Sequence, residues 1–188
     1  MVKLIQKRSR LAIVGAGGHG KVVADTAIAS EKFSEIVFLD DRLPPRSRVL
    51  KLPVIGGDAE IERLSSQGFE FVVAVGNNET RCSIFCDLQA KSVRFRTIIH
   101  PSAIISSSAE IGEGVVIFSN VCVNADAHIG SNVILNTSAS IDHDCFLRFG
   151  CHVGPGATVS GGCDVGEKVF LGAGSVLVQG VTVGEDSV

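Results

Sequence analysis

The chain has 188 residues, of which 45% are hydrophobic and 20% charged, and its formal net charge is −3. Although the mean hydropathy is positive at +0.35, the apolar residues form no run of about 18 uncharged positions, so we expect no membrane span. Tyr and Trp are absent, which argues against a surface that stacks on nucleic-acid bases.

Charge divides the chain into two parts near residue 98. Residues 1–98 contain 15 Lys and Arg against 11 Asp and Glu, whereas residues 99–188 contain 2 against 9. The basic start lacks the cleavage site of a secretory signal peptide, and the six cysteines include no CxxC pair. We therefore expect reduced thiols in a cytoplasmic protein with two domains, residues 1–97 and residues 98–188.

The first part has the pattern of a nucleotide-binding α/β unit. An apolar run at residues 11–14 predicts a buried strand, and it leads into the glycine-rich segment 15–20 and a helical segment at 21–29. This order of strand, GxGxxG and helix lets phosphate approach backbone N–H groups at a helix N-terminus. The alternative is that the glycines form only a tight turn between strand and helix.

Two further predicted strands in this part end in polar residues. The apolar run 36–39 is followed by Asp40 and Asp41, and the run 71–75 is followed by residues 76–78, Gly-Asn-Asn. Ligands in open α/β sheets bind beyond the carboxyl ends of the strands. A single nucleotide fits this short unit better than NAD, because the second half of a dinucleotide fold is missing. The alternative for the aspartate pair is a solvated loop.

The second part is a six-residue repeat. An aliphatic residue occupies every sixth position from Ile99 to Val183, and a small or β-branched residue follows four positions later. This is the signature of a hexapeptide β-helix. Three hexads form one triangular coil in which both residue types point inward, so residues 18 apart become neighbours in stacked coils. The predicted fold is a Rossmann-like α/β domain followed by a left-handed parallel β-helix.

His143 is the candidate for catalysis. It follows the inward Ile141 by two places, at an outward-facing corner between Asp142 and Asp144. A carboxylate that accepts from one imidazole nitrogen fixes the tautomer and leaves the other nitrogen free as a general base. One coil later lies Gly161, whose backbone N–H could stabilise an oxyanion. The alternative is an ordinary surface histidine in a polar corner.

The remaining prism residues that could carry chemistry are assigned to turns or to the interior. His128 and His152 each lie five places after an inward residue, where a solvated turn is expected. Their spacing with His143 differs from that of the hexapeptide-repeat zinc carbonic anhydrases, so we expect no metal site. Cys145 and Cys151 point inward by register, which disfavours acyl transfer through a thiol.

These motifs together resemble the nucleotide-sugar N-acetyltransferases of the sialic-acid O-acetyltransferase-like group, most closely the UDP-4-amino-sugar N-acetyltransferases of bacillosamine biosynthesis. The matching stretches, in family order, are 14–20, 38–41, 75–81, 99–103 and 136–144. The resemblance implies a homotrimer in which acetyl-CoA lies between adjacent prisms. It also implies that the N-terminal domain holds the nucleotide sugar.

The resemblance also implies roles for individual residues. His143 would take a proton from the sugar 4-amino group, with Asp144 orienting it and Gly161 donating to the oxyanion. His152 would contact the thioester region of acetyl-CoA, and Asn136 would lie near the acceptor sugar. The implied nucleotide-binding residues are Gly17, Gly18 and His19 at the diphosphate, Asp40 and Asp41 at the base and ribose, and Asn77, Asn78 and Arg81 nearby.

The implied reaction is direct attack of the free amine on the thioester, without an acyl-enzyme. Two alternatives are O-acetylation of a sialic acid and a non-catalytic trimer that binds a nucleotide sugar. Members of the resembled family usually continue beyond the position of Val188, with further hexads and a tail that packs near the coenzyme. We therefore expect this sequence to lack the C-terminal tail.

Overall fold

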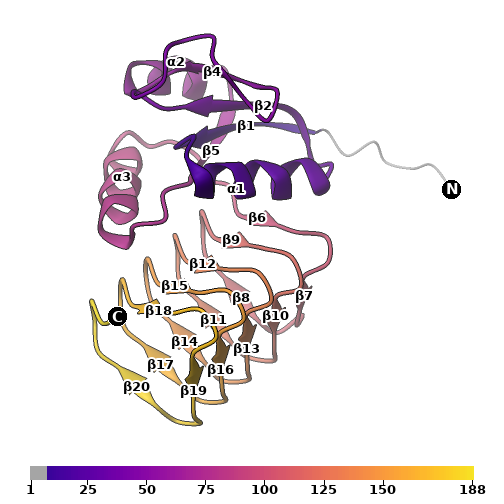
Figure 1. The fold of residues 1–188 in the computed structure, drawn as a ribbon, viewed down its shortest axis with the longest axis vertical. Helices are drawn as coiled ribbons and strands as arrows, with labels where there is room; N and C mark the ends of the chain where they lie inside the picture. The colour runs from indigo at the N-terminus through magenta and orange to yellow at the C-terminus, as the bar shows by residue number, and fades with distance from the viewer. Residues whose placement is uncertain (1–7) are drawn as a thin grey trace, which may run out of the picture.

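The structure, a computed structural model, describes residues 8–188. Most of the basic start, at residues 1–7, lies outside the described residues. An α/β domain sits on one face of a triangular prism of short strands (Figure 1). None of the helices between residues 8 and 188 has the length and apolar character needed to cross a bilayer.

The α/β domain has a five-stranded sheet in the order β3-β4-β2-β1-β5. The strands are β1 (Ser9–Val14), β2 (Phe33–Leu39), β3 (Arg48–Val49), β4 (Leu52–Gly56) and β5 (Phe69–Val73). The helices are α1 (Gly18–Ala29), α2 (Ile61–Ser66) and α3 (Asn78–Ala90), with a short 3-10 turn, η1, at Asp58–Glu60. The three predicted strands are confirmed, although the third ends at Val73, two residues earlier than predicted. The short pair β3 and β4 is antiparallel and was not predicted.

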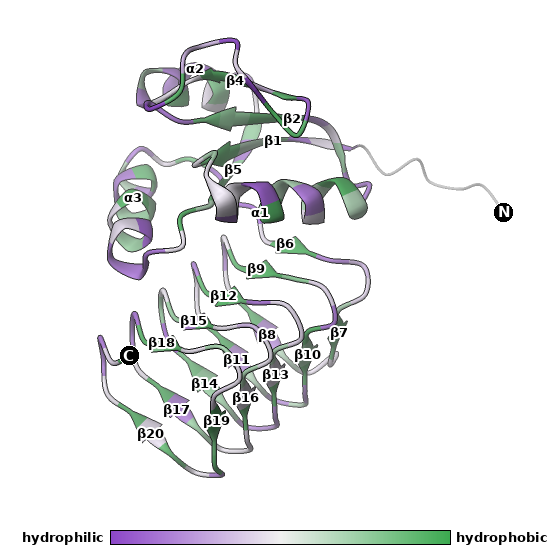
Figure 2. Ribbon diagram, in the orientation of Figure 1, coloured by the Kyte–Doolittle hydropathy of each residue, from purple (hydrophilic) through white to green (hydrophobic). Residues whose placement is uncertain are grey.

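The central strands of this sheet are buried on both faces. The last four residues of β1 are buried, as their apolar sequence requires for a parallel sheet covered on two sides. On one side α1 packs between the sheet and the prism, where Ala24 and Ala27 join Ile98 and Ile134 in one apolar cluster. Small alanines let the helix approach closely, so the domain and the prism share a core. Figure 2 shows the apolar residues concentrated in the strands of both parts.

The prism has three faces, each a sheet of five two-residue strands. The face that carries the α/β domain, the β6 face, consists of β6 (Ile98–Ile99), β9 (Val116–Ile117), β12 (Ile134–Leu135), β15 (His152–Val153) and β18 (Phe170–Leu171). The β7 face consists of β7 (Ile104–Ile105), β10 (Cys122–Val123), β13 (Ser140–Ile141), β16 (Thr158–Val159) and β19 (Val176–Leu177). The β8 face consists of β8 (Glu110–Ile111), β11 (His128–Ile129), β14 (Phe146–Leu147), β17 (Asp164–Val165) and β20 (Thr182–Val183).

The predicted register of the repeat is confirmed. Strands pair in parallel with residues 18 positions apart, as Ser140 does with Cys122 on one side and Thr158 on the other. The aliphatic residue of each hexad is the second residue of its strand, and it packs into a continuous interior cluster with the small residues. Cys145 and Cys151 are completely buried in that cluster, so they contribute packing volume.

The corners of the prism impose a backbone requirement that the hexad pattern did not reveal. From Gly114 to Asp186 every sixth residue has a positive φ, and the residue is glycine in six of the corners and a non-glycine residue in the other seven. Most of those non-glycine residues are Asn or Asp, which tolerate the left-handed region best after glycine. Asp144 occupies one of these positions, with φ of 57°. The backbone conformation of the corner therefore fixes the direction of its Cα–Cβ bond.

Candidate active site

His143 lies at the corner between the β7 and β8 faces, in the turn that joins β13 to β14. Its Nδ1 lies 2.7 Å from Asp144 Oδ2, and its backbone N–H donates to Asp142 Oδ1 at 2.8 Å. Asn124, one coil below, donates to the same Asp142 oxygen at 3.0 Å. The structure therefore contains the predicted pairing of His143 with Asp144. Nδ1 makes this contact, and Nε2 remains free.

The acidic surroundings favour the protonated form of this imidazole. The hydrogen bond to Asp144 raises the pKa of His143 above its usual value, and the charge of Asp142 adds to the effect. The side chain is about half exposed, so solvent screens these interactions. A base with a raised pKa binds a proton from a substrate more strongly.

Gly161 forms a platform under the His143 ring. A Cβ built on Gly161 would lie 2.6 Å from His143 Nε2 and 2.7 Å from Cε1, so only glycine leaves room for the ring in this position. The next residue, Gly162, donates its N–H to the His143 carbonyl oxygen at 2.9 Å. Within residues 8–188 the Gly161 N–H itself donates to no carbonyl or side chain. A free amide and a free imidazole nitrogen therefore lie side by side at this corner.

A second histidine site lies where the α/β domain covers the β6 face. His152 on β15 is buried, and its ring centroid lies 6.3 Å from that of His19 at the start of α1. Phe118 packs edge-on against His19 at 5.4 Å, and Phe170 packs against His152 at 4.9 Å. The prediction that His152 occupies a solvated turn is wrong, because this outward position of the hexad is a strand residue that the domain covers.

Asn136 fixes the protonation pattern of His152. The Thr137 N–H donates to Asn136 Oδ1 at 2.8 Å, which turns the amide nitrogen toward His152 Nε2 at 3.0 Å. His152 Nε2 is then the acceptor, and the ring proton resides on Nδ1. That Nδ1 and His19 Nε2 are both buried with no hydrogen-bond partner among the described residues. Neither of these two polar atoms is exposed to solvent.

Burial keeps both of these rings neutral. Desolvation lowers the pKa of His152 to about 4, with a further contribution from the positive charge of Arg81. Desolvation also lowers the pKa of His19 to about 4, helped by His152 and Arg81. Neutral imidazoles can donate or accept a hydrogen bond without adding charge to the interface.

A pocket of about 450 Å³ opens beside His152, and the turn after β5 forms its other wall. Asn77 lines it and caps α3 by accepting from the Thr80 N–H at 2.9 Å. Asn78 also lines it, but both ends of its amide are used within the protein: Nδ2 donates to the Lys168 carbonyl at 2.7 Å, and Oδ1 accepts from Arg81. Asn78 therefore connects the domain to the prism.

A second pocket, of about 350 Å³, lies at the carboxyl ends of β1, β2 and β5. The predicted Asp40 and Asp41 both line it, together with Gly15 of the glycine-rich segment. Gly17 and Gly18 lie next to it at the exposed start of α1, and Gly17 provides no side-chain cap for the helix. Uncapped N–H groups at a helix N-terminus are suited to an anion such as a diphosphate.

The Asp40 carboxylate accepts hydrogen bonds from the protein itself. Its Oδ1 accepts from the Arg42 backbone N–H and from Arg42 Nε, each at 3.0 Å. Its Oδ2 accepts from the Ala16 N–H and from Arg42 Nη2, each at 2.9 Å. A carboxylate has about four acceptor positions, and protein donors fill all of them. Asp40 therefore holds the glycine-rich loop and Arg42 in place.

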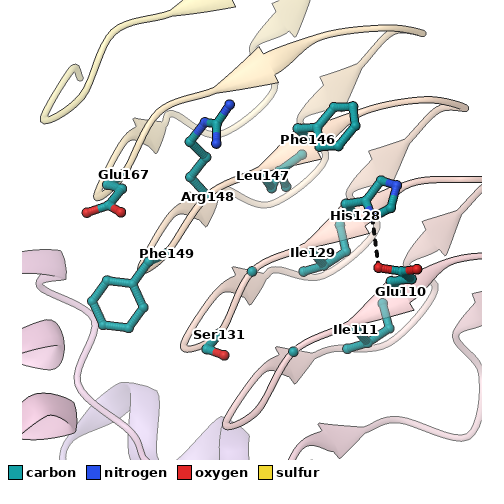
Figure 3. Close-up of a pocket in the computed structure, with 12 residues that line it drawn as sticks. Glu110, Ile111, His128, Ile129, Ser131, Phe146, Leu147, Arg148, Phe149 and Glu167 are labelled. Carbon is teal, nitrogen blue, oxygen red and sulfur yellow. Dashed lines mark hydrogen bonds and ion pairs between the residues drawn. The ribbon is translucent and has the colours of Figure 1, made fainter.

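The third hollow is on the β8 face of the prism, with a volume of about 460 Å³. Figure 3 shows Glu110, His128 and Phe146 on successive coils, with the Glu110–His128 contact marked. His128 Nδ1 lies 3.0 Å from Glu110 Oε2, and its ring stacks on Phe146 at 4.6 Å between centroids. The predicted turn position for His128 is also wrong, because the residue lies on β11 and faces outward.

Comparison with known proteins agrees with the geometry. Residues 10–88 match the PglD N-terminal domain family. The acetyltransferase domain of PglB from Neisseria gonorrhoeae FA1090, solved with acetyl coenzyme A, is 43% identical with a TM-score of 0.91, over 95% of this chain and 86% of that one. The chain belongs to the nucleotide-sugar N-acetyltransferase family.

Two other members of this family are similar to the chain. PerB from Caulobacter crescentus, solved with CoA and GDP-perosamine, is 39% identical with a TM-score of 0.86, over 95% of this chain and 84% of that one. UDP-N-acetylbacillosamine N-acetyltransferase of Bacillus subtilis (strain 168) is 36% identical over 121 residues. That match includes 58% of this chain and spans about half of the relative, 51% of its length.

Arg81 is corrected from a nucleotide contact to a structural residue. It is fully buried, and its guanidinium donates to the Asn132 and Gly150 carbonyl oxygens of the prism at 3.1 and 2.6 Å. It also donates to the Val75 carbonyl at 3.2 Å and to Asn78 Oδ1 at 2.9 Å. With its donors used inside the protein, Arg81 joins the domain to two corners of the prism and has none left for a ligand.

Several site residues were missed by reasoning from the sequence. Asn124 supports Asp142 from one coil below, and the 18-residue register could have identified it. Arg42 could not have been identified, because only the fold of the loop after β2 brings its side chain onto Asp40. Among residues 8–188, no group of three or more His, Cys, Asp or Glu side chains is arranged to hold a metal ion.

Proposed function

We propose that this chain is an acetyl-CoA-dependent N-acetyltransferase that modifies the 4-amino group of a UDP-linked amino sugar. The observation that carries the proposal is the corner at His143, where an Asp-oriented imidazole has its Nε2 free beside the unpaired N–H of Gly161. Similar relatives solved with acetyl-CoA, and with CoA and GDP-perosamine, support the class of both substrates. UDP is proposed from the resemblance to the bacillosamine enzymes.

In the proposed reaction the sugar amine attacks the thioester carbonyl carbon directly. The new C–N bond forms as the carbonyl π electrons move to oxygen, and the Gly161 N–H donates to this oxyanion. His143 Nε2 takes the proton that the amine nitrogen loses. The C–S bond then breaks, and the proton on His143 is available to the departing thiolate. Asp144, bonded to Nδ1, holds the proton of the neutral ring on Nδ1, so that Nε2 is the acceptor before attack, and it stabilises the imidazolium afterwards.

The cysteines are poorly suited to a route through an acyl-enzyme. Burial raises the pKa of the Cys151 thiol to about 12 and also raises that of Cys145. The thiolate is the reactive form, so neither thiol is activated near neutral pH. Both side chains also point into the prism interior, away from either pocket. Direct transfer needs neither of them.

A single chain does not bring the catalytic corner to the nucleotide pocket. His143 lies between the β7 and β8 faces, whereas the α/β domain packs on the β6 face (Figure 1). We therefore propose that one copy supplies the corner and an adjacent copy supplies the domain, in a homotrimer with acetyl-CoA between prisms. A ring with threefold symmetry joins two different surfaces of the chain.

Two exposed faces of the prism are available for such an interface. Ile104 and Val176 on the β7 face are 71% and 65% exposed, and Phe146 on the β8 face is 45% exposed. Exposed apolar side chains favour burial against another copy. We propose that the β7 face of one copy packs on the β8 face of the next. In light scattering, we expect a mass three times that of the chain, and Phe146→Glu should lower it.

The proposal is tested by titrating UDP, GDP, dTDP, CMP and NAD calorimetrically and by assaying acetyl transfer to 4-amino sugars with mass spectrometry. We expect UDP to bind most tightly and an acetyl group to appear on the amine. Tight binding of CMP with transfer to a hydroxyl would instead indicate a sialic acid O-acetyltransferase. Nucleotide binding without transfer to any amine in the presence of acetyl-CoA would indicate a non-catalytic binding protein.

A further inference from the structure

Arg42 is held across the mouth of the pocket at the ends of β1 and β2 by an unusual arrangement. Its guanidinium makes a two-point contact with Asp40, through Nε to Oδ1 at 3.0 Å and Nη2 to Oδ2 at 2.9 Å. The Asp40 side chain is only 5% exposed, whereas that of Arg42 is 78% exposed. A buried carboxylate thus fixes the plane of an exposed guanidinium. Its Nη1 group donates to no other residue in the described part of the chain.

The anchor of this arrangement does not depend on pH in the ordinary range. Arg42 holds the pKa of Asp40 far below its usual value, and the N–H groups of Ala16 and Arg42 lower it further. Asp40 is therefore ionised wherever the protein is folded near neutral pH. Because the Ala16 N–H belongs to the glycine-rich segment, the same carboxylate ties Arg42 to the loop beside the start of α1.

The pocket otherwise presents mainly acceptors. Its charged lining consists of Arg42 and three aspartates, Asp40, Asp41 and Asp58. Asp41 Oδ2 accepts from the Asp58 N–H at 3.4 Å, and the Asp41 carboxylate lies against Gly57. Carboxylates can accept from ribose hydroxyls and from the N–H groups of a base, but they repel carbonyl oxygens. Arg42 is the one cation of this lining, and Thr80 is its only hydroxyl side chain.

Uracil and guanine each present N–H donors next to a keto oxygen, whereas adenine has no keto oxygen. An arginine guanidinium is the side chain best suited to donate to such an oxygen. We infer that Arg42, held by Asp40, is a specificity-determining residue that donates through Nη1 to a keto oxygen of the nucleotide base. This inference rests on the proposed function, since it assigns a base contact within the proposed nucleotide pocket.

The competing explanation is that Arg42 only neutralises Asp40. Under that explanation, loss of Arg42 would lower stability and weaken all ligands of the pocket alike. A base contact has a different consequence, because it affects keto bases and leaves the diphosphate site at the start of α1 unchanged. The charge alone is also insufficient for a base contact: Lys can pair with Asp40, but it cannot hold that pair and present a second donor in a fixed plane.

The experiment measures the Kd of UDP, GDP, ADP and inorganic pyrophosphate by calorimetry for the wild type, Arg42→Ala, Arg42→Lys and the control Arg48→Ala. Arg48 lies in the same segment between β2 and β4. Its side chain donates to the Lys51 carbonyl oxygen, outside the pocket. We expect the wild type to prefer its keto nucleotide to ADP. Arg42→Ala and Arg42→Lys should both raise the Kd of that nucleotide about tenfold, with pyrophosphate binding unchanged and Arg48→Ala like the wild type.

Three results would overturn the inference while leaving the proposed acetyl transfer intact. These are equal wild-type affinity for ADP and the keto nucleotides, full rescue by Arg42→Lys, or equal weakening of the nucleotides and pyrophosphate by Arg42→Ala. The first uses the wild type alone, so it stands even where an Arg42 variant unfolds, which thermal melting would show. A wild type that binds no nucleotide would overturn the proposed function itself, and with it this inference.

Discussion

The two histidine sites place the same side chain in opposite electrostatic settings. His143 lies on an exposed corner next to two carboxylates, which raise its pKa. His152 lies under the α/β domain, where desolvation and Arg81 lower its pKa to about 4. The His143 ring can therefore accept a proton. The His152 ring is kept neutral, and Asn136 holds its proton on Nδ1.

Under the proposed function, this difference would separate proton transfer at His143 from ligand positioning at His152. A base must exchange its proton readily during turnover, which requires solvent or substrate access and a pKa near the working pH. A neutral, buried hydrogen-bonding group must do the opposite and hold one tautomer. Changes at the corner should therefore act mainly on turnover, whereas changes at the interface should act on binding and on the pH dependence of stability.

The largest effect should come from His143→Ala. Without the base, the bound ammonium has no partner to take its proton, so we expect turnover to fall about 10²-fold or more. The Kd of UDP, measured by calorimetry, should be unchanged, because the nucleotide pocket lies on the domain. His100→Ala is the control, since His100 bonds only to Ser102 at another corner. Unchanged acetylation by His143→Ala would remove the assigned role.

Gly161→Ala should have the next largest effect. The new Cβ would lie 2.6 Å from His143 Nε2, so the imidazole must move, and a displacement of about 1 Å can cost as much as 10²-fold in turnover. The protein itself should remain stable, because the atoms that give way belong to an exposed side chain. Gly172→Ala is the matched control, because nothing lies within 4 Å of a Cβ there. Equal turnover by the two variants would show that the ring position has no importance.

Asp144→Asn should have a smaller effect and a distinctive pH signature. Asn tolerates the positive φ of this corner, but it removes the charge that raises the pKa of His143. The acidic limb of kcat/KM against pH should move to lower pH, because the imidazole then loses its proton at lower pH. The maximal rate should fall about tenfold, as for loss of a group that orients a functional histidine. An unshifted acidic limb would contradict the assignment of Asp144.

The regular parts of this molecule were predictable because short-range chemistry determines them. The hexad pattern identified every inward aliphatic residue of the prism. It also predicted the 18-residue register, because each coil consists of three hexads. The same register correctly placed His143 at an exposed corner and Cys145 and Cys151 in the interior. The carboxyl ends of the three strands also meet at one pocket, as predicted.

Two of the differences from the sequence predictions come from contacts between elements that are distant in the sequence. His152 is buried, and Arg81 is structural, because the α/β domain lies across the β6 face, and no local pattern specifies that docking. Asp40 was expected to contact the nucleotide because the sequence shows a free carboxylate after a strand. Only the folded loop shows that Arg42 and the Ala16 N–H occupy its acceptor positions.

The pH dependence of stability tests the contrast between the two histidine sites most directly. At neutral pH it should also give the smallest change. Because the pKa of His152 is lowered to about 4, the unfolded chain binds more protons than the folded chain between pH 6.5 and about 4. Stability should therefore fall with falling pH in this window, with a slope that approaches about 1.4 kcal/mol per pH unit for one histidine. His152→Gln should make the decline shallower in urea titrations.

His143→Gln should act in the opposite direction. The raised pKa of His143 means that the folded chain binds the proton more strongly than the unfolded chain does. This binding contributes stability below the pKa of the unfolded state, and the contribution is lost as pH rises through the pKa of the folded state. Its removal should make the decline toward low pH steeper, by a small amount because the ring is exposed. Slopes that change with the same sign in the two variants would show that the two sites do not differ in the way the structure indicates.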